Sequence, residues 1–98
     1  MNPPAQQHSA TSIAAARSIA DRVNRLQSEI LAFLRERPTG ATDDDMQAEL
    51  GMQGSTQRPR RIELVAKGLV QAAPERRKTK SGRLATVWVA APSTGRRA

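Results

Sequence analysis

The sequence predicts an α+β domain in which three helices precede a two-stranded β-hairpin. Apolar residues recur every three or four positions over 12–37, as they do along one face of a helix. Two shorter stretches, 43–50 and 56–67, follow residues that favour helix starts. Beyond them the period changes: 69–74 is expected to be a short strand, and 84–90 is rich in strand formers. A chain of 98 residues leaves room for one such domain.

The first helix is expected over 12–37, with Thr11 or Ser12 as its cap and Pro38 beyond its end. Asp21 could also begin a second segment, so this stretch is either one helix or two. Its apolar stripe consists of Ala16, Ile19, Val23, Leu26, Ile30 and Phe33. The first part of the stripe either covers another face of the same domain or pairs with a second copy as a short coiled coil, which would give a homodimer.

Four segments are expected along the chain. Residues 1–10 are polar and contain two prolines, so they predict a disordered leader. Residues 11–25 form a helical extension, 26–91 form the domain, and 92–98 form a flexible tail. The leader has neither an apolar stretch nor an early basic cluster, so it does not resemble a signal peptide.

The second helix, 43–50, follows Thr42, whose side chain suits the N-cap position. The acidic run 43–45 places negative charge on the first turn, where the helix dipole favours it. This explanation is simpler than a metal site, because no His or Cys lies nearby. Gly51 fits the left-handed position that ends a helix.

The third helix, 56–67, follows a turn at 51–54. Ser55 or Thr56 is expected to cap it, which places Pro59 in its first turn, where the missing N–H costs little. Its buried stripe is expected to consist of Ile62, Val65 and Leu69.

The predicted strands at 69–74 and 84–90 flank a basic loop, 75–83, with Ser81-Gly82 near its tip. Trp88 lies in the second strand. A lone Trp at such a position packs on the core or its rim more often than it stacks on a base, so we expect packing.

The net charge of +7 is concentrated in one part of the chain. Residues 55–83 contain nine basic and two acidic side chains, whereas the rest of the chain is balanced. A segregated field of this kind indicates a polyanionic partner.

The composition argues against several other classes of function. The chain has no Cys, its single His8 lies in the leader, and no apolar run is long enough to span a bilayer. It contains no nucleophile–base pair and no Gly-rich phosphate loop. We therefore expect a soluble, cytoplasmic protein without enzymatic activity and without a metal, cofactor, membrane or small-molecule ligand.

The order of long helix, short helix, turn, basic helix and hairpin is that of a winged helix-turn-helix domain. The runs 55–65 (STQRPRRIELV) and 67–70 (KGLV) look like the recognition helix and first wing strand of small bacterial and bacteriophage winged-helix proteins. The run 76–83 (RRKTKSGR), followed by Val87-Trp88, is similar to their wing. The resemblance covers roughly residues 22–90 and implies this fold and DNA binding in general terms.

Residues of the third helix are expected to enter the major groove. With the apolar stripe inward, Gln57, Arg60 and Arg61 point outward, where Gln can read adenine and Arg can read guanine. Ser55 and Thr56 would hold a phosphate at the helix N-terminus, and the basic loop would contact the backbone or the minor groove. The complete expected set of DNA-binding residues is Ser55, Thr56, Gln57, Arg58, Arg60, Arg61, Lys67, Arg76, Arg77, Lys78, Lys80 and Arg83.

The expected function is therefore double-stranded DNA binding, by a transcriptional regulator or by a phage-encoded accessory factor in replication or recombination. The alternative is a winged-helix interaction module whose basic surface binds an acidic host or replication protein. Salt-dependent binding to arbitrary duplex DNA separates the two, because a module built for an acidic protein would show little DNA affinity even at low salt.

Overall fold

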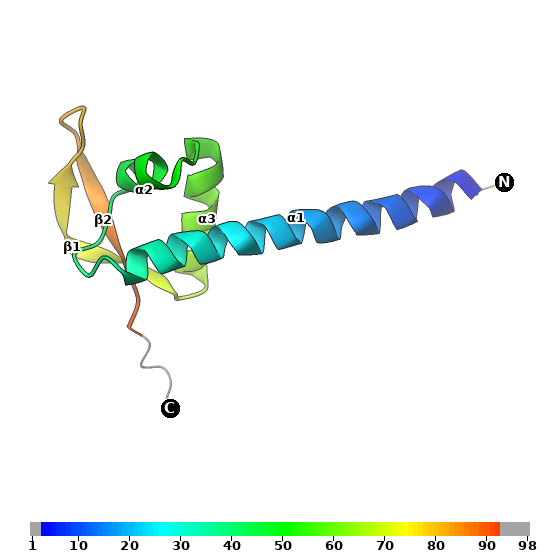
Figure 1. Cartoon of the computed structure of the whole chain (residues 1–98), viewed down its shortest axis with the longest axis horizontal. Helices are drawn as coiled ribbons and strands as arrows, with labels where there is room; N and C mark the ends of the chain where they lie inside the picture. Colours follow the sequence, from blue (N-terminus) through cyan, green and yellow to red (C-terminus); the bar gives the residue numbers. More distant parts are fainter. Residues whose placement is uncertain (1–2, 93–98) are drawn as a thin grey trace.

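The computed structural model describes residues 3–92, with side chains from residue 13 onward. It has three helices and two strands, in the order α1 (Pro3–Arg35), α2 (Asp43–Leu50), α3 (Gly54–Ala66), β1 (Val70–Lys78) and β2 (Leu84–Ala90). The strands form an antiparallel hairpin beside the three helices (Figure 1). The predicted α+β class, with three helices before a hairpin, is confirmed at this level.

The first helix is longer than the sequence suggested. α1 is a single helix of 33 residues, so Asp21 does not start a second segment. It begins at Pro3, whereas a disordered leader is expected from the sequence over 1–10. Proline is tolerated in the first turn of a helix, and the Ala and Gln residues that follow have good helix propensity. Except for Pro92, the expected tail at 92–98 lies outside the described residues.

Only the C-terminal half of α1 packs on the rest of the molecule. Ile30 and Leu34 are buried there, whereas every side chain from residue 13 to residue 22 is exposed. The N-terminal half of the helix projects away from the other elements (Figure 1). The expected helical extension is therefore present, and in this single chain it covers no other face of the domain.

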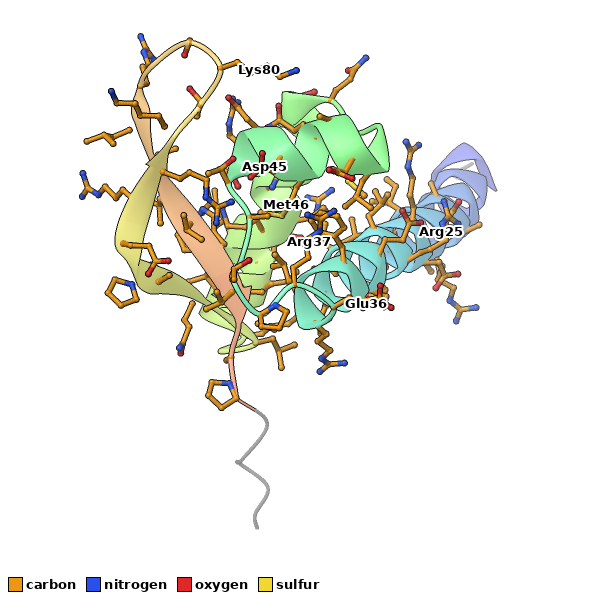
Figure 2. All side chains as sticks on the ribbon, turned by 60° about the vertical axis from the view of Figure 1, so that its left-hand side comes forward. Arg25, Glu36, Arg37, Asp45, Met46 and Lys80 are labelled. Carbon is orange, nitrogen blue, oxygen red and sulfur yellow. The ribbon has the colours of Figure 1, made fainter. Side chains whose placement is uncertain are left out.

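The core is small and mostly aliphatic. Its buried residues are Ile30, Leu34, Ala41, Met46, Leu64 and Val70. Trp88 and Phe33 are partly buried against this cluster, which confirms packing as the role of Trp88. Met46 extends from α2 toward the interior between the helices and the hairpin (Figure 2).

The ends of α2 follow the sequence signals closely. Thr42 forms a capping box with Asp45: the Asp45 N–H donates to Thr42 Oγ1 at 3.1 Å, and the Thr42 N–H donates to Asp45 Oδ2 at 3.1 Å. Gly51 ends the helix with φ of 67°, which is the left-handed conformation that favours glycine. Both expectations for this helix are confirmed.

The link between α1 and α2 pairs with the hairpin. The Ala41 N–H donates to the Trp88 carbonyl at 3.0 Å, and the Trp88 N–H donates to the Ala41 carbonyl at 2.8 Å. Gly40 precedes this bridge with φ of 82°, and its backbone lies directly against β2. The helices and the hairpin are thereby fixed to one another at the centre of β2.

The hairpin is longer than the predicted strands. β1 continues to Lys78, which pairs with Leu84, so residues 75–78 of the expected loop at 75–83 are strand. Pairing is irregular between Ala72 and Arg76, around Pro74, which cannot donate a ladder hydrogen bond. The true loop, 79–83, is closed by the Thr79 N–H donating to the Arg83 carbonyl at 2.8 Å.

Among residues 3–92, none of the helices has the length and apolar character that a bilayer crossing would require.

Candidate nucleic-acid interface

The buried face of α3 differs from the expected one. Gln57 and Leu64 are buried, whereas Ile62 is 54% exposed and Val65 and Leu69 are 36% and 37% exposed. The expected apolar stripe is therefore not the buried face of this helix. Apolar character alone gave the wrong face, because a polar network with α2 compensates the burial of Gln57.

The start of α3 also differs. The helix begins at Gly54 after Gln53, whose side chain makes no capping hydrogen bond, so neither Ser55 nor Thr56 is the cap. Pro59 is consequently inside the helix rather than in its first turn. It cannot donate to the carbonyl of Ser55, so that turn of α3 lacks one helical hydrogen bond.

Gln57 is fully buried and its amide group is engaged. Its Nε2 donates to Asp43 Oδ1 at 2.9 Å, and its Oε1 accepts from Gln47 Nε2 at 2.9 Å. The expectation that Gln57 points outward to read adenine is therefore wrong. Its side chain instead joins α3 to α2.

Arg61 is also directed inward. Its Nε and Nη2 donate to the two carboxylate oxygens of Asp43 at 3.0 and 2.7 Å, and its guanidinium lies over the Trp88 ring, 4.1 Å from the centroid. A planar guanidinium held by a bidentate pair and an aromatic face has little freedom to reach a base. The outward orientation expected for Arg61 is wrong.

Arg60 lies on the side of α3 that meets α1. Its Nε and Nη2 donate to the Glu63 carboxylate at 2.7 and 2.8 Å. Glu63 Oε1 also accepts from Gln27 Nε2 at 2.8 Å, and Lys67 Nζ donates to Gln27 Oε1 at 2.6 Å. Arg60 and Lys67 therefore belong to a network that joins α3 to α1, and the groove-facing position expected for Arg60 is wrong.

These pairings favour the charged forms of the two acids. Burial of Asp43 opposes its ionisation, but the hydrogen bonds from Arg61 and Gln57 and the nearby charges of Arg61 and Arg58 outweigh this, so the pKa of Asp43 lies below its ordinary value. The hydrogen bond from Arg60 has the largest effect on Glu63 and lowers its pKa as well. Both acids thus neutralise arginines of α3 at neutral pH.

The outward face of α3 carries Ser55, Arg58 and Ile62, which stand three and four residues apart and so form one stripe. Arg58 is exposed and forms no ion pair with any described residue. Its guanidinium lies close to Gly54, where an added Cβ would be 3.1 Å from Nη1. Of the arginines on α3, Arg58 is thus the one whose charge the structure leaves uncompensated by a direct pair.

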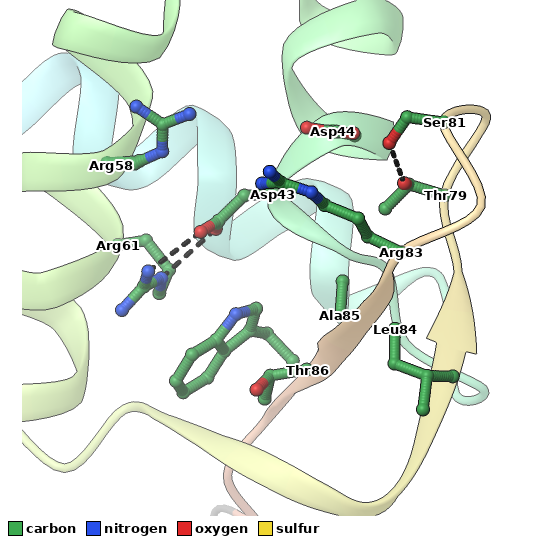
Figure 3. Close-up of a pocket in the computed structure, with 11 residues that line it drawn as sticks. Asp43, Asp44, Arg58, Arg61, Thr79, Ser81, Arg83, Leu84, Ala85 and Thr86 are labelled. Atoms are coloured by element: carbon green, nitrogen blue, oxygen red, sulfur yellow. Dashed lines mark hydrogen bonds and ion pairs between the residues drawn. The ribbon is translucent and has the colours of Figure 1, made fainter.

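A pocket of about 310 Å³ lies between α3 and the hairpin; we call it the α3–hairpin groove. Arg58 and Arg61 line it from α3, and Arg83 and Thr86 line it from the hairpin (Figure 3). Asp43 and Asp44 of α2 line its end, and Trp88 contributes its indole. Thr79 and Ser81 bring hydroxyl groups to the same groove, and these had not been expected as site residues although they lie within the basic run.

One basic residue of the hairpin contacts the α2 side of the domain, and the other four are exposed. Arg77 contacts the α2 side, since its Nη1 lies 3.4 Å from Asp45 Oδ2 and its Nη2 donates to the Thr39 carbonyl at 3.2 Å. The remaining basic side chains of the hairpin are exposed and have no ion-pair partner in the described part of the chain: Arg76, Lys78, Lys80 and Arg83. Lys80 is at the tip of the hairpin (Figure 2).

The structure thus brings together only part of the expected site. Of the expected residues, Arg58, Arg61 and Arg83 line the α3–hairpin groove, whereas Lys78 and Lys80 line a separate pocket with residues of α2. Ser55 lies on the outward face of α3 and Arg76 on β1, and neither lines these two pockets. Thr56 lies on the other side of α3, in a shallow pocket with Leu26 and Met52. The sequence alone could not show which arginines of the basic run are paired and which are exposed, because the pairing depends on residues of α1 and α2.

Comparison of the chain with protein-family models, with curated protein sequences and with solved structures gave no match.

Proposed function

We propose that this chain is a winged helix-turn-helix protein that binds double-stranded DNA. In this proposal α2, the turn at 51–53 and α3 form the helix-turn-helix, and the hairpin is the wing. The order α1, bridge at Ala41, α2, α3, β1, β2 supports it, because this arrangement places a helix and a hairpin beside one another on one side of the molecule.

One observation carries the proposal: within the basic run 55–83, five exposed basic residues form neither an ion pair nor a side-chain hydrogen bond with any described residue, and all five lie on the two elements that flank the α3–hairpin groove. Arg58 contributes from α3, and Arg83 from the hairpin. The basic residues on the α1-facing side of α3 are instead engaged with Glu63 and Gln27. Positive charge that is left unpaired at one groove is the arrangement that a phosphate backbone would compensate.

Each element has a different role in the proposed complex. α3 would enter the major groove, where Arg58 is able to donate to guanine O6 and N7. Ser55 and the backbone N–H groups at the start of α3 would face a phosphate. Arg76, Lys78, Lys80 and Arg83 would contact phosphates on either side of the wing, which position the protein without reading sequence.

The proposal implies a site of action on DNA in the bacterial cytoplasm or nucleoid, as a transcriptional regulator or a phage-encoded accessory factor. The test is a fluorescence anisotropy titration of the full chain against a duplex of 20 base pairs at three salt concentrations. With about five phosphate contacts, log K should fall against log salt with a slope of about −4 to −5. Absence of binding at low salt, or a slope near zero, would contradict DNA binding and favour an acidic protein as the partner.

We further propose that the projecting half of α1 pairs two copies of the chain. Ile13 and Ile19 are 58% and 64% exposed there. Ile19 lies on the same face of α1 as Ile30, which is buried against the rest of the domain further along the helix. A helix of this length without tertiary contacts gains stability by covering such a stripe. Sedimentation equilibrium should show a dimer, and Ile19→Glu should dissociate it while Ala14→Glu, on the opposite side of the helix, should not. A monomer for the unmodified chain would contradict the pairing.

A further inference from the structure

An apolar side chain occupies the outward face of α3 beside Arg58, the one arginine of α3 that has no ion-pair partner among the described residues. Ile62 is 54% exposed, and it stands four residues after Arg58, which is one turn further along the same side of the helix. The buried positions Gln57 and Leu64 lie on the other side of α3. Ile62 therefore contributes nothing to the core in this chain, and its side chain is directed to solvent.

The spacing fixes where Ile62 would lie on a duplex. Four residues of α-helix rise about 6 Å, and successive base pairs are about 3.4 Å apart. If Arg58 is opposite one base, the Ile62 side chain is thus opposite a base one or two pairs away. An isoleucine side chain gains nothing from contact with a hydrated phosphate, but it can make an apolar contact with a methyl group on the major-groove edge of a base.

Resting on the proposed DNA binding, we infer that Ile62 is a specificity-determining residue that contacts the C5-methyl group of a pyrimidine, thymine or 5-methylcytosine, one or two base pairs from the base facing Arg58. The C5-methyl group is the apolar feature of the major-groove edges, and aliphatic side chains recognise it by excluding water. Burial of one such group changes affinity by about fourfold. Arg58 and Ile62 together would read a guanine near a methylated pyrimidine.

The chain offers a matched control for this contact. Leu84 is also an exposed aliphatic residue, with 62% of its surface accessible, and it lines the α3–hairpin groove from β2. Because Leu84 lies on β2 and not on α3, it is not part of the proposed methyl contact, and its replacement should leave the sensitivity to the methyl group in place whatever it does to overall affinity. Removing Leu84 therefore tests the loss of an exposed aliphatic side chain without loss of the proposed methyl contact.

The experiment begins with selection of a preferred duplex from a randomised library by the full-length chain. Each thymine of that duplex is then replaced singly by deoxyuridine, which removes only the methyl group, and the Kd is measured for the unmodified protein, Ile62→Ala, Ile62→Val and Leu84→Ala. We expect one replacement to weaken the unmodified protein and Leu84→Ala about fourfold and to leave Ile62→Ala unchanged. Ile62→Val should retain part of the sensitivity. At that position, a 5-methylcytosine pair should bind the unmodified protein and Leu84→Ala more tightly than an unmethylated cytosine pair, and it should give Ile62→Ala no such gain.

Several results would overturn the inference. If no thymine replacement affects the unmodified protein, or if Ile62→Ala remains as sensitive as the unmodified chain, Ile62 reads no methyl group, although DNA binding stands. A selection that returns no preferred sequence has the same meaning. If Ile62→Ala instead changes the sedimentation coefficient of the protein without DNA, the stripe is a protein contact. If the unmodified chain binds no duplex at low salt, the proposed function itself fails, and the inference with it.

Discussion

The carboxylate of Asp43 links two helices of the domain. It accepts hydrogen bonds from both Gln57 and Arg61, so it joins the first turn of α2 to the inner face of α3. The same residue, read from the sequence, had only the role of a favourable charge in a first turn. Two of the three consecutive aspartates have separate roles in the fold: Asp43 binds Arg61 of α3, and Asp45 completes the capping box and pairs with Arg77.

The lowered pKa of Asp43 gives a test of this role. Because the pKa is lower in the folded chain than in the unfolded chain, the stabilisation is present at neutral pH and disappears as the pH falls through the folded-state pKa. Asp43→Asn should lower the free energy of unfolding by about 2 kcal/mol at pH 7. Urea denaturation at pH 7 and at pH 3 measures this. The difference between the two proteins should be smaller at the lower pH, and an equal difference at both pH values would contradict the ionic role of Asp43.

Gly40 is required for a different reason. It has φ of 82°, and a Cβ at this position would lie 2.6 Å from Val87 Cγ1 and 2.7 Å from the Trp88 carbonyl oxygen. Gly40→Ala should therefore lower the free energy of unfolding by more than about 2 kcal/mol, from backbone strain and steric overlap together.

Gly51 provides the control, since its φ is 67° but no atom lies within 4 Å of an added Cβ. Gly51→Ala should cost about 1 kcal/mol, for the backbone alone. Thermal denaturation of both variants gives the comparison, and equal losses would show that Gly40 does not lie against β2 as described.

At the scale of elements, the sequence predicted the type and order of the helices and strands better than it predicted which face of a helix is buried. The Thr42 cap and the Gly51 end of α2 depend on residues within a few positions, so local rules were sufficient. The face of α3 depends on what α1 and α2 offer it. Gln57 is buried because Asp43 and Gln47 satisfy its amide, and that compensation is not visible in the periodicity of α3.

The hairpin length escaped prediction for a related reason. The first strand was expected to end at 74, but pairing resumes at Arg76 opposite Thr86, because an irregular step accommodates Pro74, which cannot donate a ladder hydrogen bond. Lys78 then pairs with Leu84, which moves the expected loop residues into the strand and shortens the loop. As a result the basic side chains of the hairpin stand on a paired scaffold.

The position of these side chains on paired strands leads to a prediction for the basic residues of the hairpin. Lys80→Ala and Arg83→Ala should each weaken binding to the selected and a scrambled duplex by the same factor, and each should flatten the salt slope by about one unit, because phosphates carry no sequence information. Arg77→Ala is the control on the same hairpin, since Arg77 contacts Asp45 and Thr39, and it should change the slope less. Anisotropy titrations at three salt concentrations give all three slopes. A loss confined to the selected duplex would show that the wing reads bases.

At the scale of the whole molecule, the charge of the chain is less important than how the fold distributes it. The nine basic residues of 55–83 form one run in the sequence, but the fold separates them. Those on the inner and α1-facing sides of α3 stabilise the packing of helices, and those on the groove side and the hairpin remain exposed. The sequence therefore predicted the electrostatic character of the surface, while the fold is needed to say which arginine occupies it.

The most direct test compares two arginines that are two residues apart on the same helix. Arg58→Ala and Arg60→Ala change the net charge equally, but Arg58 lines the α3–hairpin groove and Arg60 is paired with Glu63 on the other side. Binding of both variants to the selected duplex should be measured at one salt concentration, with circular dichroism to verify folding. We predict that Arg58→Ala weakens binding by about 1–3 kcal/mol, and that Arg60→Ala changes it by less than about 0.5 kcal/mol. Equal losses, or a larger loss for Arg60→Ala, would contradict the claim that the α3–hairpin groove is the DNA-binding surface.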